Sequence, residues 1–471
     1  MKYIKRNIFA LILFCVLFVV AKIQHLTLPF FWDEAWPYST GVFHMYSNGL
    51  SLLPGSVPFD ISRGHPLFFH FISAIWMKIF GTSLMVIHLF PLLISILLIM
   101  CVYFFCIDFF SDAVALASCL LLMVQPVFFS QSAMLLPEIM VALLTLLSLW
   151  TFLHKKKLLY ILFATLLLLT KESGMVIIIA LFSWNIIEKI RQNKQQRFLR
   201  ILAEGIYLLV PIAIAAIFFI LQKIKTGYFF FPMYVSENNF KWAVFAEKLK
   251  NYFAYVFIYQ GRNILSIVLI LSIAVILMRK FKISPKHKQI IFPMIIFSAL
   301  YLIFSSLSFY SPRYMLSILP FLTLISSYML FTAAQRKRVI YFTSLTFIIL
   351  ASVFYCFRKK PVTDHSPGFA DGVSVTQNAI NWCEVKNMQD KKIYSSFLLQ
   401  MHLTHPEHGY LSSDKRFNNV VNSFDSTVDV CIFPNYEYDE SYNVLKQHGN
   451  FKLVKRFEKN YAWCEIYEIA N

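Results

Sequence analysis

The sequence is short of glycine, of charged residues and of closely spaced cysteines, and each shortage excludes a class of protein. Only 13 of the 471 residues are glycine, and none forms a glycine-rich loop of the kind that cradles nucleotide phosphates. The eight cysteines include no Cys-x-x-Cys pair, which argues against a zinc site and a disulfide framework. Charged residues make up 14% of the chain, against about 25% in soluble proteins. The composition therefore excludes an ordinary soluble protein.

Long apolar runs are present instead. Hydrophobic residues form 58% of the chain, and the mean hydropathy is +0.61. Because a helix needs about 20 apolar residues to cross a bilayer, we predict a mostly helical polytopic membrane protein with about eleven transmembrane helices. The candidate runs are Ile8–Val20, Leu84–Ile107, Ala113–Phe129, Ile139–Leu153, Leu158–Leu169, Met175–Ile187, Leu202–Leu221, Ile264–Met278, Ile290–Leu307, Tyr314–Ala333 and Val339–Phe357.

Basic residues fall in short clusters between these runs. A net charge of +18 would suit a nucleic-acid partner, but clusters of this kind are typical of cytoplasmic loops. All the clusters face the cytoplasm only if the extra segment Pro66–Phe80 lies on the membrane surface, so we predict an interfacial helix there, in the first outer loop. The clusters are Lys2/Lys5/Arg6, Lys155–Lys157, Lys189 to Arg200, Arg279 to Lys288 and Arg336–Arg338.

The two ends of the chain complete this topology. The first apolar run lacks the small-residue cleavage pattern of a signal peptide, so we expect an uncleaved first span with a cytoplasmic N-terminus. Residues 358–471 are polar and contain no candidate span. We predict a transmembrane domain over 1–357 and a small extracytoplasmic α/β domain over 358–471. Its expected helices are Val375–Val385 and Ser441–Gln447, and its expected strands are Lys392–Phe397, Val428–Phe433, Phe451–Phe457 and Ala462–Ile469.

Two motifs of the first outer loop carry candidate functional groups. In FWDEAW, Asp33 and Glu34 lie among aromatic residues that suit the membrane interface. A carboxylate at the lipid boundary suits a general base for a hydroxyl, whereas the alternative is a helix start that Asp33 caps. In SRGHPL, Arg63 and His65 precede the interfacial helix. They can bind a phosphate or anchor a lipid headgroup.

Three further motifs lie at predicted outer ends of spans. Glu138 follows Pro137, as acids often do at a helix start, but it is also a candidate second acid or, with Asp33, a ligand for a divalent cation. Lys171 and Glu172 interrupt two apolar runs and are costly there unless they form a mutual pair or contact water. Arg313, followed by Tyr314, can extend toward water from a span or hold a phosphate through two hydrogen bonds.

Taken in order, these motifs resemble the GT-C membrane glycosyltransferases of the protein O-mannosyltransferase and lipid A aminoarabinose transferase type. The resemblance runs from Met1 to about Phe357 through WDEAWPYS, RGHPLFFHFISAIWMKIFG, LLPEIM, LLLTKESGM and SPRYMLSILP. A single proline follows His65, where the family often has two. The C-terminal domain matches no specific relative.

The resemblance implies a cell-envelope enzyme of the inner (plasma) membrane that moves a sugar from a polyprenyl-phosphate donor to a hydroxyl on the outer face. By position, Asp33 would be the general base, with Glu34 a catalytic neighbour and Glu138 shaping the site or binding a cation. The donor phosphate would be held by Arg63, His65, Lys171, Arg313 and the adjacent Tyr314. The acceptor stays open, and no nucleic acid is expected as a partner.

Two other readings stay open at this stage. A transporter or lipid-linked sugar flippase would place charges in the middle of spans, whereas here the carboxylates lie at span ends. An O-antigen polymerase or ligase would use the same type of donor with a larger carrier.

Overall fold

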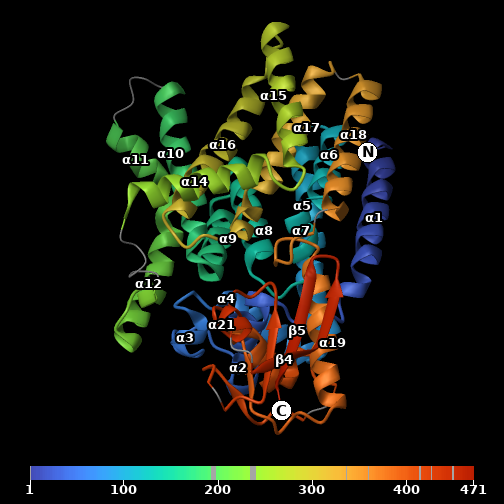
Figure 1. The fold of residues 1–471 in the computed structure, drawn as a ribbon. Coiled ribbons are helices and arrows are strands. Elements are labelled where there is room, and N and C mark those ends of the chain that lie inside the picture. The colour runs from blue at the N-terminus through green and yellow to red at the C-terminus, as the bar shows by residue number, and fades with distance from the viewer. Residues whose placement is uncertain are drawn as a thin grey trace.

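The computed structural model describes residues 2–192, 198–233, 240–335, 337–358, 360–412, 415–425, 427–447 and 450–470. These residues form a helical bundle with a small mixed sheet at one end (Figure 1). Arg336 and residues 193–197, which belong to two of the predicted basic clusters, lie outside the described residues.

Long apolar helices make this a multi-pass membrane protein. Within the described residues, six helical segments are long and apolar enough to cross a membrane, and the pair α14 (Trp242–Phe257) and α15 (Arg262–Met278), bent by 81°, adds a seventh candidate. The six contain α1 (Lys2–Lys22), α5 (Leu84–Phe109), α10 (Met175–Gln192), α11 (Phe198–Gly205) with α12 (Val210–Thr226), α16 (Pro285–Ser306) and α18 (Arg338–Arg358).

The other predicted spans form shorter helices, so the count of about eleven stays a prediction. They are α6 (Asp112–Met123), continued by α7 (Pro126–Gln131), and α8 (Glu138–Leu153), α9 (Lys157–Thr170) and α17 (Leu319–Ala333). Helices α6, α8 and α17 are buried over most of their length, as expected for helices that are apolar on every side. By contrast α1 and α18 expose aliphatic side chains such as Leu17 and Leu350, which suits a lipid-facing surface.

The basic clusters that can be placed lie at one end of the bundle. The N-terminus, one end of α15 and the start of α18 lie in the upper part of Figure 1. Side-chain contacts connect the helices at this end: Asp108 of α5 contacts His154 after α8, and Asp112 of α6 contacts Arg338 of α18. The C-terminal sheet lies at the opposite end. This arrangement agrees with the predicted separation of basic loops from the outer motifs.

The first outer loop contains three helices beside the C-terminal domain (Figure 1). These are α2 (Thr40–Asn48), α3 (Phe59–Ser62) and α4 (Phe68–Phe80). The helix expected over Pro66–Phe80 is therefore present and begins at Phe68, whereas its position at the membrane surface stays a prediction.

The C-terminal region folds as a small α/β unit, as the sequence predicts. Its sheet has the order β2-β1-β3-β5-β4, in which β1 pairs in parallel with β2 and β3, and β5 pairs antiparallel with β3 and β4. The strands are β1 (Ile393–Ser395), β2 (Val420–Val421), β3 (Val430–Pro434), β4 (Phe451–Lys459) and β5 (Ala462–Ile469), and the helices are α19 (Phe369–Val385), α20 (Phe397–Thr404) and α21 (Ser441–Gln447). The sequence missed α20 and β2.

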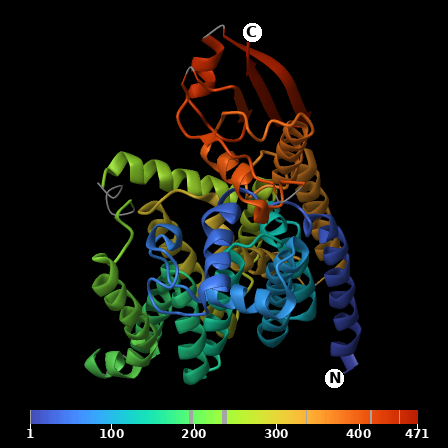
Figure 2. The same ribbon diagram turned by 90° about the horizontal axis from the view of Figure 1, so that it is seen from below.

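This unit packs directly on the loop that carries Asp33. The Phe30 N–H donates to the His408 carbonyl over 3.0 Å, and the Phe31 ring lies 6.0 Å from that of Phe369 and 5.3 Å from that of Tyr436. Turned by 90°, the C-terminal unit again lies against the helices rather than apart from them (Figure 2). The fold therefore brings the tail to the outer motifs.

Candidate active site

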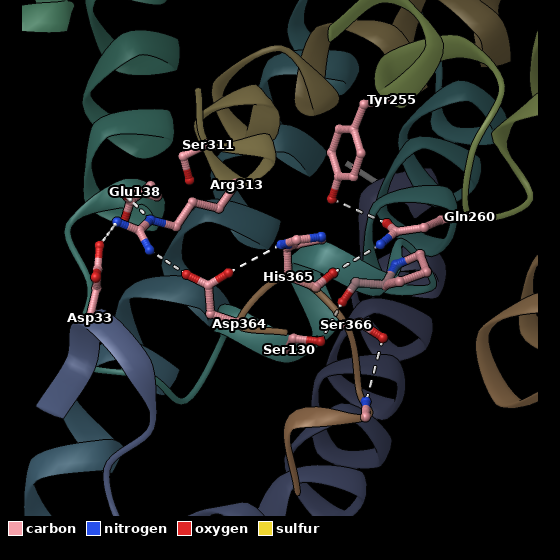
Figure 3. Close-up of polar contacts among 12 residues, drawn as sticks. Asp33, Ser130, Glu138, Tyr255, Gln260, Ser311, Arg313, Asp364, His365 and Ser366 are labelled. Carbon is pink, nitrogen blue, oxygen red and sulfur yellow. Dashed lines mark hydrogen bonds and ion pairs between the residues drawn. The ribbon is translucent and has the colours of Figure 1, made fainter. Parts of the chain in front are cut away.

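Arg313 is the centre of a buried ionic network at the outer-motif end of the bundle. Its guanidinium contacts Asp33, Asp364 and Glu138, the last through Nε at 3.2 Å (Figure 3). Lys171 Nζ lies 3.1 Å from the same Oε1 of Glu138. The sequence places these groups in separate motifs, and the structure brings four of the predicted site residues, Asp33, Glu138, Lys171 and Arg313, into one network.

Short irregular segments position these side chains at the ends of helices. Asp33 lies in the 3-10 turn η2 (Trp32–Glu34), Glu138 is the first residue of α8, and Arg313 lies in the 3-10 turn η6 (Pro312–Ser317) before α17. Asp364 lies between α18 and α19. Each charge is therefore held outside the middle of an apolar helix, where a polar group is most costly.

Burial makes the pairing obligatory. The side chains of Arg313 and Glu138 are each 3% exposed and that of Lys171 is 7% exposed, whereas Asp33 retains 23%. Burial alone would lower the pKa of Arg313, but the charges of Asp33, Asp364 and Glu138 raise it well above its ordinary value. For Asp364 burial alone would raise the pKa, yet the Arg313 guanidinium holds it well below the usual range. Both groups are therefore charged, and Asp33 is the carboxylate of the network that water reaches most.

A cavity of about 570 Å³ opens beside Asp33. Its walls contain Asp33, Arg63, Arg313 and Asp364 together with several aromatic rings. Arg63 stacks on Trp36, with the guanidinium carbon 4.6 Å from the ring centroid, and it lines the cavity without an ion-pair partner among the residues that the structure describes. The aromatic residues of the lining are Trp32, Trp36, Phe309, Tyr310, Tyr314, Phe397, Tyr436 and Tyr438.

A second cavity, of about 360 Å³, lies next to the first and shares Phe309 and Tyr314 with it. It combines cationic groups with an apolar wall. Lys171 Nζ lies 4.0 Å from the centroid of the Tyr314 ring, and His65 Nδ1 lies 2.9 Å from Glu172 Oε2. Its lining is His65, Lys171, Glu172, Ser173, Met175, Phe230, Lys248, Tyr301, Phe304, Ser305, Leu307, Ser308, Phe309 and Tyr314.

The pairing of Lys171 and Glu172 differs from the simple expectation. The two residues do not pair with each other, because Lys171 contacts Glu138 and Glu172 contacts His65. Of the five predicted phosphate ligands, Lys171 and His65 line the second cavity, Arg63 and Arg313 line the first, and Tyr314 lines both.

Glu34 has a different environment from its neighbour Asp33. It is 2% exposed, and its Oε1 lies 2.9 Å from His88 Nε2 and accepts the Leu135 N–H over 2.6 Å. Its Oε2 accepts the Phe31 N–H over 3.2 Å. These donors occupy both oxygens, so Glu34 fixes the loop against α5 and the start of α8, and Asp33 is the member of the predicted acid pair that faces the cavity.

The residues of these cavities that the sequence missed include two acids and a lysine. Asp364 lies six residues beyond the end of α18, in the polar tail, where an isolated acid carries no local sign of function. Lys248 belongs to α14, in a loop for which no helix was expected, and its Nζ donates to the Ser308 carbonyl over 2.7 Å. Glu437 follows β3 in the C-terminal unit, which carries no local sign of function.

A divalent cation does not fit the residues as they are arranged. Asp33 and Glu138, the two candidate ligands, both contact the Arg313 guanidinium, which occupies the space between them that a cation would need. Within the described residues, no group of three or more histidine, cysteine or acidic side chains is arranged to hold a metal. The fixed positive charge of this site comes from Arg313 and Lys171.

Comparisons with known proteins agree with the sequence motifs. A family model described as dolichyl-phosphate-mannose-protein mannosyltransferase matches residues 64–218. This segment includes His65, Glu138 and Lys171. No curated protein gives a significant match to the sequence. The predicted family resemblance is confirmed.

Solved structures extend the fold beyond the matched segment. ArnT from Cupriavidus metallidurans in the apo state is 11% identical with a TM-score of 0.56, covering 96% of this chain and 97% of that one. The same protein bound to undecaprenyl phosphate is 13% identical with a TM-score of 0.55, covering 97% of each chain. The ArnT-like fold therefore includes the C-terminal unit, for which the sequence alone indicated no relative.

Proposed function

We propose that this chain is a membrane glycosyltransferase that moves a sugar from a polyprenyl-phosphate donor to a hydroxyl acceptor on the outer face of the membrane. The observation that carries the proposal is the placement of Asp33, in a polar cavity, beside a second cavity that joins cations to an apolar wall. The mannosyltransferase family model and the ArnT-like fold support the same class.

The second cavity suits the donor's phosphate and the first part of its lipid chain. Lys171 and Lys248 supply positive charge, His65 supplies a ring nitrogen for hydrogen bonding, and Phe230, Phe304 and Leu307 supply apolar surface. The donor chain partitions into the bilayer, so its phosphate reaches the protein at the depth of the span ends. The related ArnT was crystallised with undecaprenyl phosphate, a ligand of this chemistry.

The reaction needs a base at the acceptor and positive charge at the leaving group. Asp33 takes the proton of the acceptor hydroxyl while the oxygen of that hydroxyl bonds to the anomeric carbon of the donor sugar. The bond between that carbon and the phosphate oxygen breaks, and polyprenyl phosphate leaves with the electron pair. Attack from the face opposite the phosphate inverts the anomeric centre. Arg63 and Lys171, one from each cavity, stabilise the departing phosphate without protonating it.

Arg313 positions the base in this scheme. It contacts Asp33 on one side and the buried Asp364 and Glu138 on the others, so the Asp33 carboxylate has a fixed direction toward the cavity. A preorganised carboxylate needs little rearrangement during the reaction. Tyr314 lines both cavities and lies between the donor and acceptor sides.

The test compares cells that carry the gene, lack it, or carry Asp33→Asn. Mass spectrometry of lipid-linked sugars and envelope glycans should show one modified species that disappears without the gene. Asp33→Asn should lower transfer by about 10²–10⁴-fold, the usual contribution of a general base. Purified Asp33→Asn should bind undecaprenyl phosphate within about twofold of the wild type, because the base acts on the acceptor side.

The matched control is Asp60→Asn. Asp60 lies in α3 of the same outer loop, is exposed, and lines neither cavity, so its substitution should leave transfer unchanged. An envelope that is identical with and without the gene contradicts the proposal. Retained transfer by Asp33→Asn removes Asp33 as the base, and gene-dependent movement of intact lipid-linked sugar across the membrane would favour a flippase instead.

A further inference from the structure

The C-terminal unit supplies a large part of the wall of the Asp33 cavity. Ten residues beyond the last span line it, and one of them, Glu437, is a carboxylate from the turn between β3 and α21. The cavity is thus a junction between the first outer loop and the tail. The tail residues of the lining are Val362, Thr363, Asp364, His365, Ser396, Phe397, Leu398, Tyr436, Glu437 and Tyr438.

The two oxygens of Glu437 differ in their hydrogen bonding to the protein. Oε2 accepts the Leu398 N–H at the start of α20 over 3.3 Å. Oε1 is buried and accepts no hydrogen bond of normal geometry from the described residues, although the Ser396 hydroxyl and the Leu399 N–H lie near the carboxylate. A buried carboxylate oxygen without a donor is costly, and native proteins rarely retain one without a reason. Glu34 differs, because both of its oxygens have hydrogen-bond partners in the protein. Glu34 is therefore a structural acid, whereas Glu437 has an oxygen that can accept a hydrogen bond from a ligand.

The turn that carries Glu437 is fixed against the loop of Asp33. The Tyr436 hydroxyl hydrogen-bonds Thr376 of α19, and the Tyr436 ring packs 5.3 Å from Phe31, two residues before Asp33. On the other side, Asp439 accepts from the Tyr394 hydroxyl over 2.9 Å and from the Ser441 N–H. Glu437 is therefore held in a defined position relative to the proposed base.

We propose that Glu437 is an acceptor-binding residue that takes a hydrogen bond from a hydroxyl of a saccharide acceptor, next to the hydroxyl that Asp33 deprotonates. This inference rests on the function proposed above and names the acceptor class. Aromatic rings and carboxylates on one wall suit a sugar, because the apolar faces of a sugar ring pack on aromatics and its neighbouring hydroxyls need placed acceptors. Trp32, Trp36, Phe397 and Tyr438 supply such rings here.

The acceptor affinity should depend on pH through Glu437. Burial raises the pKa of Glu437 to about 7, and Asp439 also raises it, while Ser396 and the amides of Leu398 and Leu399 act in the opposite direction. Below that pH the carboxyl is protonated and is a weaker acceptor; above it the carboxylate accepts strongly. The KM for the acceptor should therefore fall as pH rises through about 7. The titratable groups that face Glu437 are Asp439, Tyr410, Tyr436 and Cys464.

The experiment uses the full chain reconstituted in liposomes with lipid-linked donor. Envelope membranes from cells that lack the gene provide the acceptor. Initial transfer rates are measured against the amount of acceptor membrane between pH 6 and pH 8 for the wild type, Glu437→Gln and Glu440→Gln. Glu440 is an exposed acid in the same turn that lines neither cavity, which makes it the matched control.

Glu437→Gln should raise the acceptor KM by about 10- to 100-fold, as expected for a lost hydrogen bond to a charged group, and should remove the pH step. Undecaprenyl phosphate binding should stay within about twofold, and Glu440→Gln should match the wild type. If Glu437→Gln fails to insert, Glu437→Asp, which keeps the charge on a shorter side chain, should show the raised KM with the pH step retained.

The outcomes separate this inference from the function on which it rests. A wild type that transfers nothing overturns the proposed function. A wild type that transfers, with a Glu437→Gln variant of unchanged acceptor KM and pH profile, overturns the role of Glu437 alone. An equal loss of undecaprenyl phosphate binding would place Glu437 on the donor side. Mass spectrometry that finds the sugar on a peptide hydroxyl overturns the saccharide acceptor.

Discussion

Ion pairs at the two ends of the helix bundle differ in their exposure to solvent. At the basic end, the Arg338 and Asp112 side chains are 68% and 32% exposed, and those of Lys189 and Glu204 are 26% and 41% exposed. At the opposite end, Arg313 and Glu138 are each 3% exposed. Exposed pairs contribute about 0–1 kcal/mol, whereas a buried charge depends strongly on its partners. The comparison indicates that the charges at the two ends differ in how strongly they depend on their partners.

Of the substitutions that test this comparison, removal of Arg313 should lower the stability of the protein most. Arg313→Met leaves the carboxylates of Asp33, Asp364 and Glu138 close together, with Lys171 beside Glu138 and the His365 ring beside Asp364. We expect a loss of about 3–5 kcal/mol in the free energy of unfolding, the range for breaking a buried pair from one side. Thermal unfolding of the purified protein in detergent, together with the amount inserted into membranes, measures the change.

Two further variants identify the cause of that loss. Arg313→Lys keeps a point charge without the planar donors and should recover part of the stability. Arg313→Met combined with Asp364→Asn removes one uncompensated charge and should be more stable than Arg313→Met alone. If the double variant is the less stable protein, lost packing rather than unpaired charge explains the defect.

Substitution of Lys171 should have an intermediate effect, on donor binding as well as on stability. It contacts Glu138 and also lines the second cavity, so Lys171→Met should lower both the stability and the affinity for undecaprenyl phosphate. We expect the affinity to fall by about 10- to 100-fold, as for a lost hydrogen bond to a charged group. Isothermal titration with undecaprenyl phosphate in detergent gives the affinity.

Lys248→Met is the counterpart for Lys171. Lys248 lines the same cavity but contacts a backbone carbonyl rather than an acid, so its loss should weaken donor binding with little change in stability. Equal stability losses in the two variants would argue that the Lys171–Glu138 pair does not contribute to stability.

The sequence predicted most of the helical segments and grouped the motifs that the structure places at one end of the bundle, because hydrophobic runs and basic loops are strong local signals. It even placed Ala462–Ile469 and Ser441–Gln447 at their observed bounds. It did not predict which charges meet. Lys171 and Glu172 are adjacent, and adjacent residues at a helix start point in different directions, so each finds a distant partner instead.

The same reason separates Asp33 from Glu34. Their shared motif suggested a shared role, but the turn η2 directs Asp33 to the cavity and Glu34 to His88. Asp364 and Glu437 could not be singled out because an isolated acid in a polar tail resembles any solvated surface residue. Their significance comes only from long-range packing, which joins the tail to the first outer loop.

Lys189 at the basic end should show the smallest effect. Its Nζ contacts Glu204 over 2.5 Å, but both side chains reach solvent, where water and salt compensate for a lost pair. Lys189→Met should therefore change the free energy of unfolding by less than about 1 kcal/mol and leave undecaprenyl phosphate binding unaltered. Thermal unfolding at low and high salt, beside Lys171→Met, makes the comparison direct. If the two lysine variants lose similar stability, the contrast between an exposed and a buried end does not hold, because burial would then add nothing to the contribution of an ion pair to stability.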